Sequence, residues 1–282
     1  LSPNSYRITI MGVNLGQSDI FVDKELAINP GKVFGQLQGI PGKEPAFGLD
    51  AVWIDPHQRE QAQTFGYTVV DSSTVVATHL SDILQRNAAK LLGREEVQHL
   101  LNGLAKLAPK LVEELPGSIS PQLLTRVLQN LLEENIPIKD LRTIAETLAS
   151  QSGKSQDPVA LTASVRVALG RLIVQKINGV RPELNVIVFQ PELERILHDV
   201  VQTAGDSGAG IEPGLAERLH KSLSEITQKQ EALGDPAVLL VSGPLRPMMA
   251  RFVRHGIPGL YVLSYHEVPD DKQIKVIASV GK

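Results

Sequence analysis

The fold is constrained most strongly by the stretch Glu44-Pro45-Ala46-Phe47-Gly48-Leu49-Asp50-Ala51-Val52-Trp53-Ile54. Its second half, residues 49–54, is rich in Val, Ile and Trp and predicts a strand. Phe47 comes just before that strand, in a turn flanked by Pro45 and Gly48. Two interpretations of this turn aromatic stay open: it fills the local core, or it remains exposed because a partner covers it.

Short strands joined by Gly- and Pro-rich turns surround this stretch as far as about residue 71. Strands are predicted at residues 6–13, 25–29, 49–54 and 67–71, with one helix at residues 55–65. This mixture is typical of a small α+β unit.

From residue 78 the apolar residues recur at the spacing of helices instead. Helices are predicted at residues 95–106, 121–133, 138–151 and 158–176. Beyond Gly179, strands at 185–189, 237–241, 260–263 and 273–280 alternate with helices at 192–203, 214–233 and 245–255. The sequence therefore predicts an α+β multidomain fold, with an all-helical middle region and a C-terminal α/β region. We expect these parts to move relative to one another, with joints at Gly93 and Gly179.

Composition excludes several classes of protein. The chain has 282 residues, a net charge of -3 and only 4% aromatic residues, which argues against a nucleic-acid partner. It has no cysteine, so disulfides and thiolate metal sites are excluded. No apolar run is long enough to span a bilayer, and no signal peptide is visible. Because the chain opens on Leu1 and enters a strand almost at once, we expect a piece of a longer protein whose membrane segments would lie upstream.

Recognised chemistry is missing from the sequence. The seven histidines form no HExxH or other tight ligand spacing, and the Gly205-Asp206-Ser207-Gly208 loop lacks the strand that precedes a catalytic serine. We therefore expect no catalytic residue, no metal and no cofactor. One alternative from the enzyme class remains, in which the turn from Ser242 to Arg246 follows a buried strand and binds an anionic ligand at a helix N-terminus.

The whole chain resembles the cytoplasmic domain of the flagellar type III export-gate family, the FlhA family. The resemblance is carried by residues 45–54, Thr68-Val69-Val70, Ser73-Thr74-Val75-Val76-Ala77-Thr78-His79-Leu80, Val127-Leu128-Gln129-Asn130-Leu131-Leu132, Val165-Arg166-Val167-Ala168-Leu169-Gly170-Arg171 and Leu245-Arg246-Pro247. The near relative is the gate of a virulence type III secretion system, and the contexts of Phe47 and Thr78 look flagellar.

The resemblance implies a bacterial inner-membrane protein whose cytoplasmic half, present here, forms a ring of nine below the export channel. It implies four subdomains: residues 1–22 with 72–91, an inserted second at 23–71, a helical third at 92–171 and an α/β fourth at 172–282. By the same resemblance, we expect the start of the first subdomain and the linker to the membrane to lie outside this chain, and ring formation to be weakened.

The resemblance also implies a docking site for export chaperones carrying their substrates, and contacts with components of the export ATPase complex. The implied chaperone-binding residues are Glu44, Phe47, Leu49, Val70, Val75 and Thr78. Glu44 departs from the aspartate expected there, which keeps the charge and lengthens its reach by one methylene. Thr78 has an alternative role as N-cap of the following helix.

Overall fold

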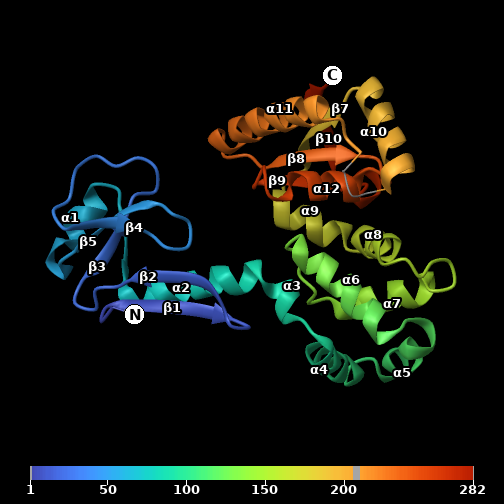
Figure 1. Ribbon diagram of the computed structural model, residues 1–282, viewed down its shortest axis with the longest axis horizontal. Helices are drawn as coiled ribbons and strands as arrows, with labels where there is room; N and C mark the ends of the chain where they lie inside the picture. The colour runs from blue at the N-terminus through green and yellow to red at the C-terminus, as the bar shows by residue number, and fades with distance from the viewer. Residues whose placement is uncertain (1, 206–209, 282) are drawn as a thin grey trace. The chain divides into compact units, whose positions relative to one another are not determined.

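The computed structural model describes residues 2–205 and 210–281. The chain forms two compact units, Leu1–Leu91 and Leu92–Lys282, and each is described by itself (Figure 1). The α+β multidomain prediction is confirmed, and the finer division into four subdomains stays a prediction. The boundary between the units falls beside Gly93, where one joint was expected.

The first unit is organised by a four-stranded antiparallel sheet. Its strands are β3 (Glu25–Ile28), β4 (Ile40–Lys43), β5 (Asp50–Ile54) and β6 (Thr68–Asp71), in the order β4-β5-β3-β6. Side chains alternate between its two faces. Leu26 and Trp53 pack with Val75 of helix α2 (Ser72–Arg86) on one face, and Ala27 and Ile54 pack with Ala62 of helix α1 (Arg59–Thr64) on the other.

A two-stranded hairpin lies against α2 and corrects one prediction. The expected strand at residues 6–13 is in fact β1 (Ser5–Ile10), a turn, and the start of β2 (Val13–Asp19). Met11 and Gly12 both have positive φ, 50° and 81°, which is the geometry of a tight hairpin turn. Met is unusual at a position with positive φ, so the sequence gives no local signal of this turn.

Helix α2 begins six residues earlier than the apolar spacing suggested. Asp71 is its N-cap, with a side chain that accepts a hydrogen bond from the backbone N of Thr74 at 2.7 Å. Thr78 therefore lies inside the helix, and its alternative role as N-cap is wrong. The β-branched run before residue 78 hid the helix start, because such residues favour strands. After α2, the short helix α3 (Ala88–Leu91) ends the unit.

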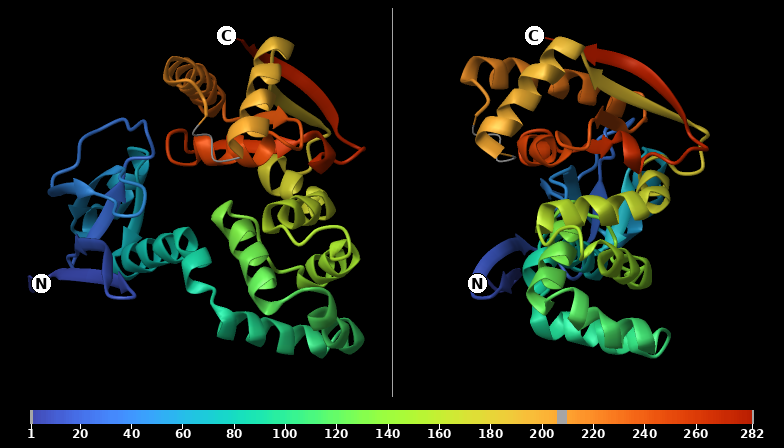
Figure 2. Two further views of the ribbon diagram at one scale, coloured as in Figure 1. Left: turned by 45° about the vertical axis from the view of Figure 1, so that its right-hand side comes forward. Right: turned by 90° about the vertical axis from the view of Figure 1, so that its right-hand side faces the viewer.

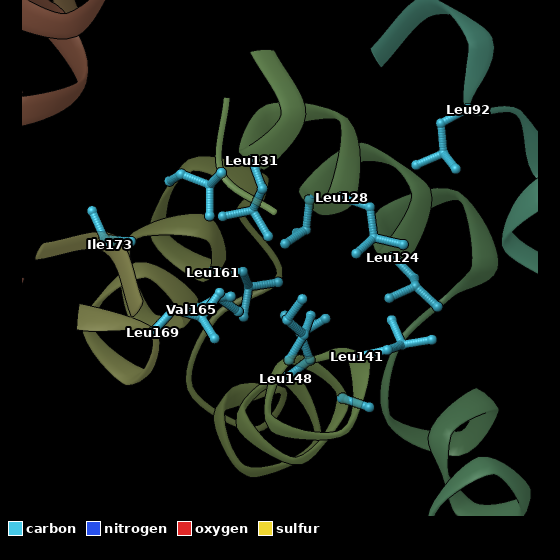
Figure 3. Packing of buried hydrophobic residues seen from close by; sticks show 14 of the residues in the cluster. Leu92, Leu124, Leu128, Leu131, Leu141, Leu148, Leu161, Val165, Leu169 and Ile173 are labelled. Carbon is cyan, nitrogen blue, oxygen red and sulfur yellow. The ribbon is translucent and has the colours of Figure 1, made fainter. Parts of the chain in front are cut away.

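The second unit starts with a helical bundle around one apolar core (Figure 3). The helices are α4 (Arg94–Ala105), α5 (Pro109–Ser118), α6 (Pro121–Glu133), α7 (Leu141–Gln151), α8 (Pro158–Ala168) and α9 (Gly170–Asn178). Helix α5 was not predicted, because it begins with one proline and contains another, Pro116. The helix predicted at 158–176 is two helices that meet at an angle of 68°.

A four-stranded parallel sheet follows, built from β7 (Glu183–Phe189), β8 (Ala237–Val241), β9 (Leu260–Ser264) and β10 (Gln273–Val280). The strand order is β10-β7-β8-β9, so the last strand of the chain returns beside the first strand of this sheet (Figure 2). The connections carry helices α10 (Pro191–Ala204), α11 (Pro213–Ala232) and α12 (Arg246–Arg254) and the 3-10 turn η3 (Tyr265–Glu267).

The helical bundle covers one face of this sheet. Val186, Val238 and Leu240 belong to the same buried cluster as the bundle residues Leu131 and Val165. The opposite face packs against α10, α11 and α12 in a second cluster. One continuous core therefore runs from the bundle into the sheet, and the movement expected at Gly179 stays a prediction.

Among the described residues, no single helix has the length and apolar character needed to cross a membrane; the bent pair α8–α9 passes that test only when taken together.

Candidate functional site

The loop between β4 and β5 presents the first three candidate residues, and Glu44 organises it from within. The Glu44 carboxylate accepts hydrogen bonds from the backbone N of Ala46 at 2.9 Å and of Phe47 at 2.7 Å. Its backbone N donates to the carbonyl of Leu49 at 2.8 Å, and its carbonyl accepts from Gly48 N at 2.9 Å. Gly48 has a φ of 72°, which glycine adopts at little cost. The loop is thus closed by four hydrogen bonds to a single residue.

Exposure differs sharply among these three residues. Glu44 is only 3% exposed, although it carries a charge, whereas the Phe47 side chain is 65% exposed and Leu49 is 39% exposed. The alternative in which Phe47 fills the core is therefore wrong. The closed, hydrogen-bonded loop instead leaves the aromatic ring in contact with solvent.

The remaining three candidates lie along β6 and α2. Val75 is 2% exposed and belongs to the apolar cluster around Trp53, against which the half-buried Val70 packs. Thr78 is half-buried one turn farther along α2. Phe47 and Leu49 are thus open to solvent, Val70 and Thr78 are partly so, and Val75 belongs to the core of the unit.

Contacts that the sequence did not reveal tie the loop to α2, and α2 to β1. Arg86, in the last turn of α2, donates from Nη2 to the carbonyl of Ala46 at 3.2 Å. The Tyr6 hydroxyl lies 2.7 Å from His79 Nδ1. Burial, together with the charge of Glu44, raises the pKa of Tyr6 to about 12. Pairings of this kind have no signal in residue spacing, because they join positions far apart in the chain.

The turn from Ser242 to Arg246, the alternative site, does not offer the anion-binding cation that the sequence predicted there. Arg246 is 4% exposed, and its guanidinium is held by Glu134 through two hydrogen bonds, of 2.7 and 2.9 Å. The positive charge of Arg246, which was expected to bind an anionic ligand, is therefore already neutralised by Glu134. Ser242 Oγ lies 3.0 Å from His198 Nε2. A catalytic serine at the turn from a strand to a helix has a strained backbone. Ser242, however, does not have a positive φ.

Glu134 is the centre of a buried charge network within the second unit. It also accepts a hydrogen bond from Arg166 Nη1 at 2.9 Å, and Arg166 in turn pairs with Glu267. Burial acts against ionisation of Glu134, but the charges of Arg246 and Arg166 outweigh it and lower its pKa. The network links the bundle, through α6 and α8, to the sheet, through α12 and η3.

In the described part of the chain, no three His, Asp or Glu side chains lie close enough together to bind a metal ion. Asp206, Ser207 and Gly208, part of the loop weighed in the sequence analysis, lie outside the described residues.

Comparison with known proteins gives a consistent result. The FHIPEP family model matches residues 1–273. The chain is 48% identical over 282 residues to the flagellar biosynthesis protein FlhA of Escherichia coli K12, covering all of this chain and 40% of that protein. Thus the chain spans less than half the length of this relative.

Two solved structures share the fold. The Chlamydia pneumoniae CdsV protein is 25% identical with a TM-score of 0.83, over 99% of this chain and 82% of that chain. The nonameric EPEC SctV-C is 24% identical with a TM-score of 0.76, over 98% of this chain and 84% of that chain.

Proposed function

The chain belongs to the FHIPEP family, and we propose that it is a cytoplasmic docking platform of the flagellar type III protein export gate. The platform binds export chaperones with their substrates and delivers the substrates for export. It performs no catalysis and needs no cofactor.

One observation supports docking above all others: Phe47 is 65% exposed on a loop that is closed by hydrogen bonds. A partner that binds an aromatic side chain on an ordered loop does not have to order the loop first, and exposed aromatics dominate the affinity of many interfaces. Leu49 is 39% exposed, and Val70 and Thr78 are half-buried, so they offer further surface suited to the apolar face of a chaperone helix.

The surrounding assembly is part of the same proposal. The full-length protein would be anchored in the bacterial inner membrane, with this part on the cytoplasmic side. It would associate into a ring, as the name of the nonameric SctV-C describes for that protein. Components of the export ATPase complex are proposed as further partners, and nucleic acid is not.

The gate of a virulence secretion system is the near alternative. The 48% identity to an FlhA protein favours the flagellar assignment. An enzyme that uses the turn from Ser242 to Arg246 is the alternative from another class, and the occupied guanidinium of Arg246 counts against it. Reproducible thermal stabilisation by a nucleotide or a phosphosugar would favour the enzyme.

The test of docking is a titration of the Phe47→Ala variant with purified flagellar export chaperones loaded with substrate. We expect binding to weaken by about 2 kcal/mol or more, roughly 30-fold in Kd, with little change in stability because the ring is exposed.

Phe34→Ala is the matched control, because Phe34 is an exposed aromatic of the same unit, 76% accessible. It should bind chaperones like the unmodified chain. Equal affinities for Phe47→Ala and Phe34→Ala would refute the docking role of Phe47.

A further inference from the structure

The chemistry around Glu44 is unlike that of a residue waiting for a partner. A carboxylate that binds another protein keeps at least one oxygen accessible, yet Glu44 is 3% exposed. Each of its oxygens already accepts a backbone N–H, of Ala46 and of Phe47. Charge-assisted bonds of this kind are among the stronger hydrogen bonds in proteins.

Those two bonds hold the backbone from which the Phe47 ring projects. The Phe47 backbone N is itself one of the donors, at 2.7 Å, so Glu44 fixes the backbone that carries the ring. The bonds of Glu44 to Gly48 and Leu49 close the loop on the other side. Arg86 then holds the loop to α2 through the Ala46 carbonyl. Without these bonds, the loop and its aromatic would sample many conformations, and binding would have to order them at an entropic cost.

We propose that Glu44 is a positioning residue of the docking site, acting through the orientation of Phe47 and making no contact with the bound partner. This inference rests on the proposed docking function. It gives Glu44 a different role from Phe47 and Leu49, which are accessible to the partner.

The consequence is a specific pattern of substitutions. Glu44→Gln places an amide NH₂ against one of two N–H donors, so one bond is lost and the loop loosens. Glu44→Asp keeps two acceptor oxygens, and an aspartate at this position of a turn bonds the N–H groups two and three residues later. Glutamine should therefore weaken docking although it preserves size, and aspartate should preserve docking although it shortens the chain.

A double-mutant cycle separates positioning from contact, with a purified substrate-loaded flagellar chaperone as the probe. We expect Glu44→Gln to raise Kd by about tenfold, Glu44→Asp by less than about threefold, and Phe47→Ala by about 30-fold. In the Phe47→Ala background, Glu44→Gln should have almost no further effect, because a residue that acts through Phe47 is silent once Phe47 is absent. Glu60→Gln, which removes an exposed carboxylate of the same unit, is the charge control.

Additive losses in the cycle would overturn the proposal, since they would mean that Glu44 touches the partner. Wild-type affinity of Glu44→Gln would also overturn it. Should Glu44→Gln fail to fold, Gly48→Ala provides the second test, because its methyl group meets no neighbouring atom and strains the loop only through the φ of 72°. Full affinity of Gly48→Ala would then contradict positioning by the loop. Unchanged binding by Phe47→Ala would instead refute the docking role of Phe47, and a lack of chaperone binding by the unmodified chain would refute the docking function itself, so these failures are distinguishable.

Discussion

Replacing Glu134 by glutamine should destabilise the second unit more than any surface charge change nearby. The carboxylate holds Arg246 through two bonds and Arg166 through a third, and its side chain is 18% exposed. A glutamine can accept from one guanidinium but turns an NH₂ group toward the other. Two buried arginines would then share the single carboxylate of Glu267.

The magnitude follows from the burial of the network. Removing one partner of a buried ion pair costs about 3–5 kcal/mol, and the partial exposure of Glu134 places the loss near 3 kcal/mol. For a unit of this size, that loss corresponds to a fall in Tm of about 6–12 °C. The neighbouring Glu133 provides the control, because its pair with Arg254 is about one-third exposed on both sides. Glu133→Gln should cost less than about 1 kcal/mol.

Far-UV circular dichroism during thermal or urea unfolding measures the effect. Trp53 is the only tryptophan of the chain and lies in the first unit, so its fluorescence reports that unit separately and should not change. Acid adds a second readout. The pKa of Glu134 is lowered in the folded chain, so its contribution is present above the unfolded-state value of about 4.3 and is lost as the pH falls through the folded-state pKa. The stability difference between the unmodified chain and Glu134→Gln should therefore close on acidification. Equal losses for Glu134→Gln and Glu133→Gln would refute the argument.

Three further predictions concern positions outside this network. Val75→Ala should destabilise the first unit by about 2 kcal/mol, because Val75 is 2% exposed. Val22→Ala, at a 78% exposed position, should change the stability little, and Trp53 fluorescence during urea unfolding compares the two variants. Stability of the first unit should fall as the pH rises from 10.0 toward about 12, since the folded-state pKa of Tyr6 is raised and the unfolded chain ionises first; Tyr6→Phe should remove this alkaline loss in the same assay. Gly170→Ala should lower the Tm, because its methyl group would lie 2.3 Å from the Glu267 carbonyl oxygen. Gly103→Ala, in open space within α4, should raise the Tm slightly, because alanine favours the helix more than glycine does. Differential scanning calorimetry measures both changes.

Local sequence signals were enough to predict many individual elements. The strand predicted at residues 273–280 matches β10 residue for residue, and the strand after Phe47 is β5 within one residue. These elements are encoded by side-chain periodicity and by the turn residues at their ends, which act over a few positions. The same short-range signals failed where a local preference misled: at the Met11–Gly12 turn, at the β-branched start of α2 and at the proline-rich α5.

The break between α8 and α9 shows a different limit. Residues 158–176 have a helical pattern throughout, and the chain nevertheless bends by 68°. At that point Gly170 packs so closely against the Glu267 carbonyl that even a Cβ would not fit. This close contact joins segments about a hundred positions apart, and a pattern within one segment does not contain it.

The sequence by itself determined the class of fold, because periodicity and turn chemistry are properties of short stretches. Its ordered motifs carry the family resemblance, and the six candidate residues of the docking site follow from that resemblance alone. It left open whether Phe47 is core or surface. Only the tertiary structure showed that Phe47 is exposed, that the Glu44 carboxylate is used within its own loop and that Glu134 neutralises Arg246. Burial and pairing depend on which distant segments pack together, and the packing of the whole chain sets them.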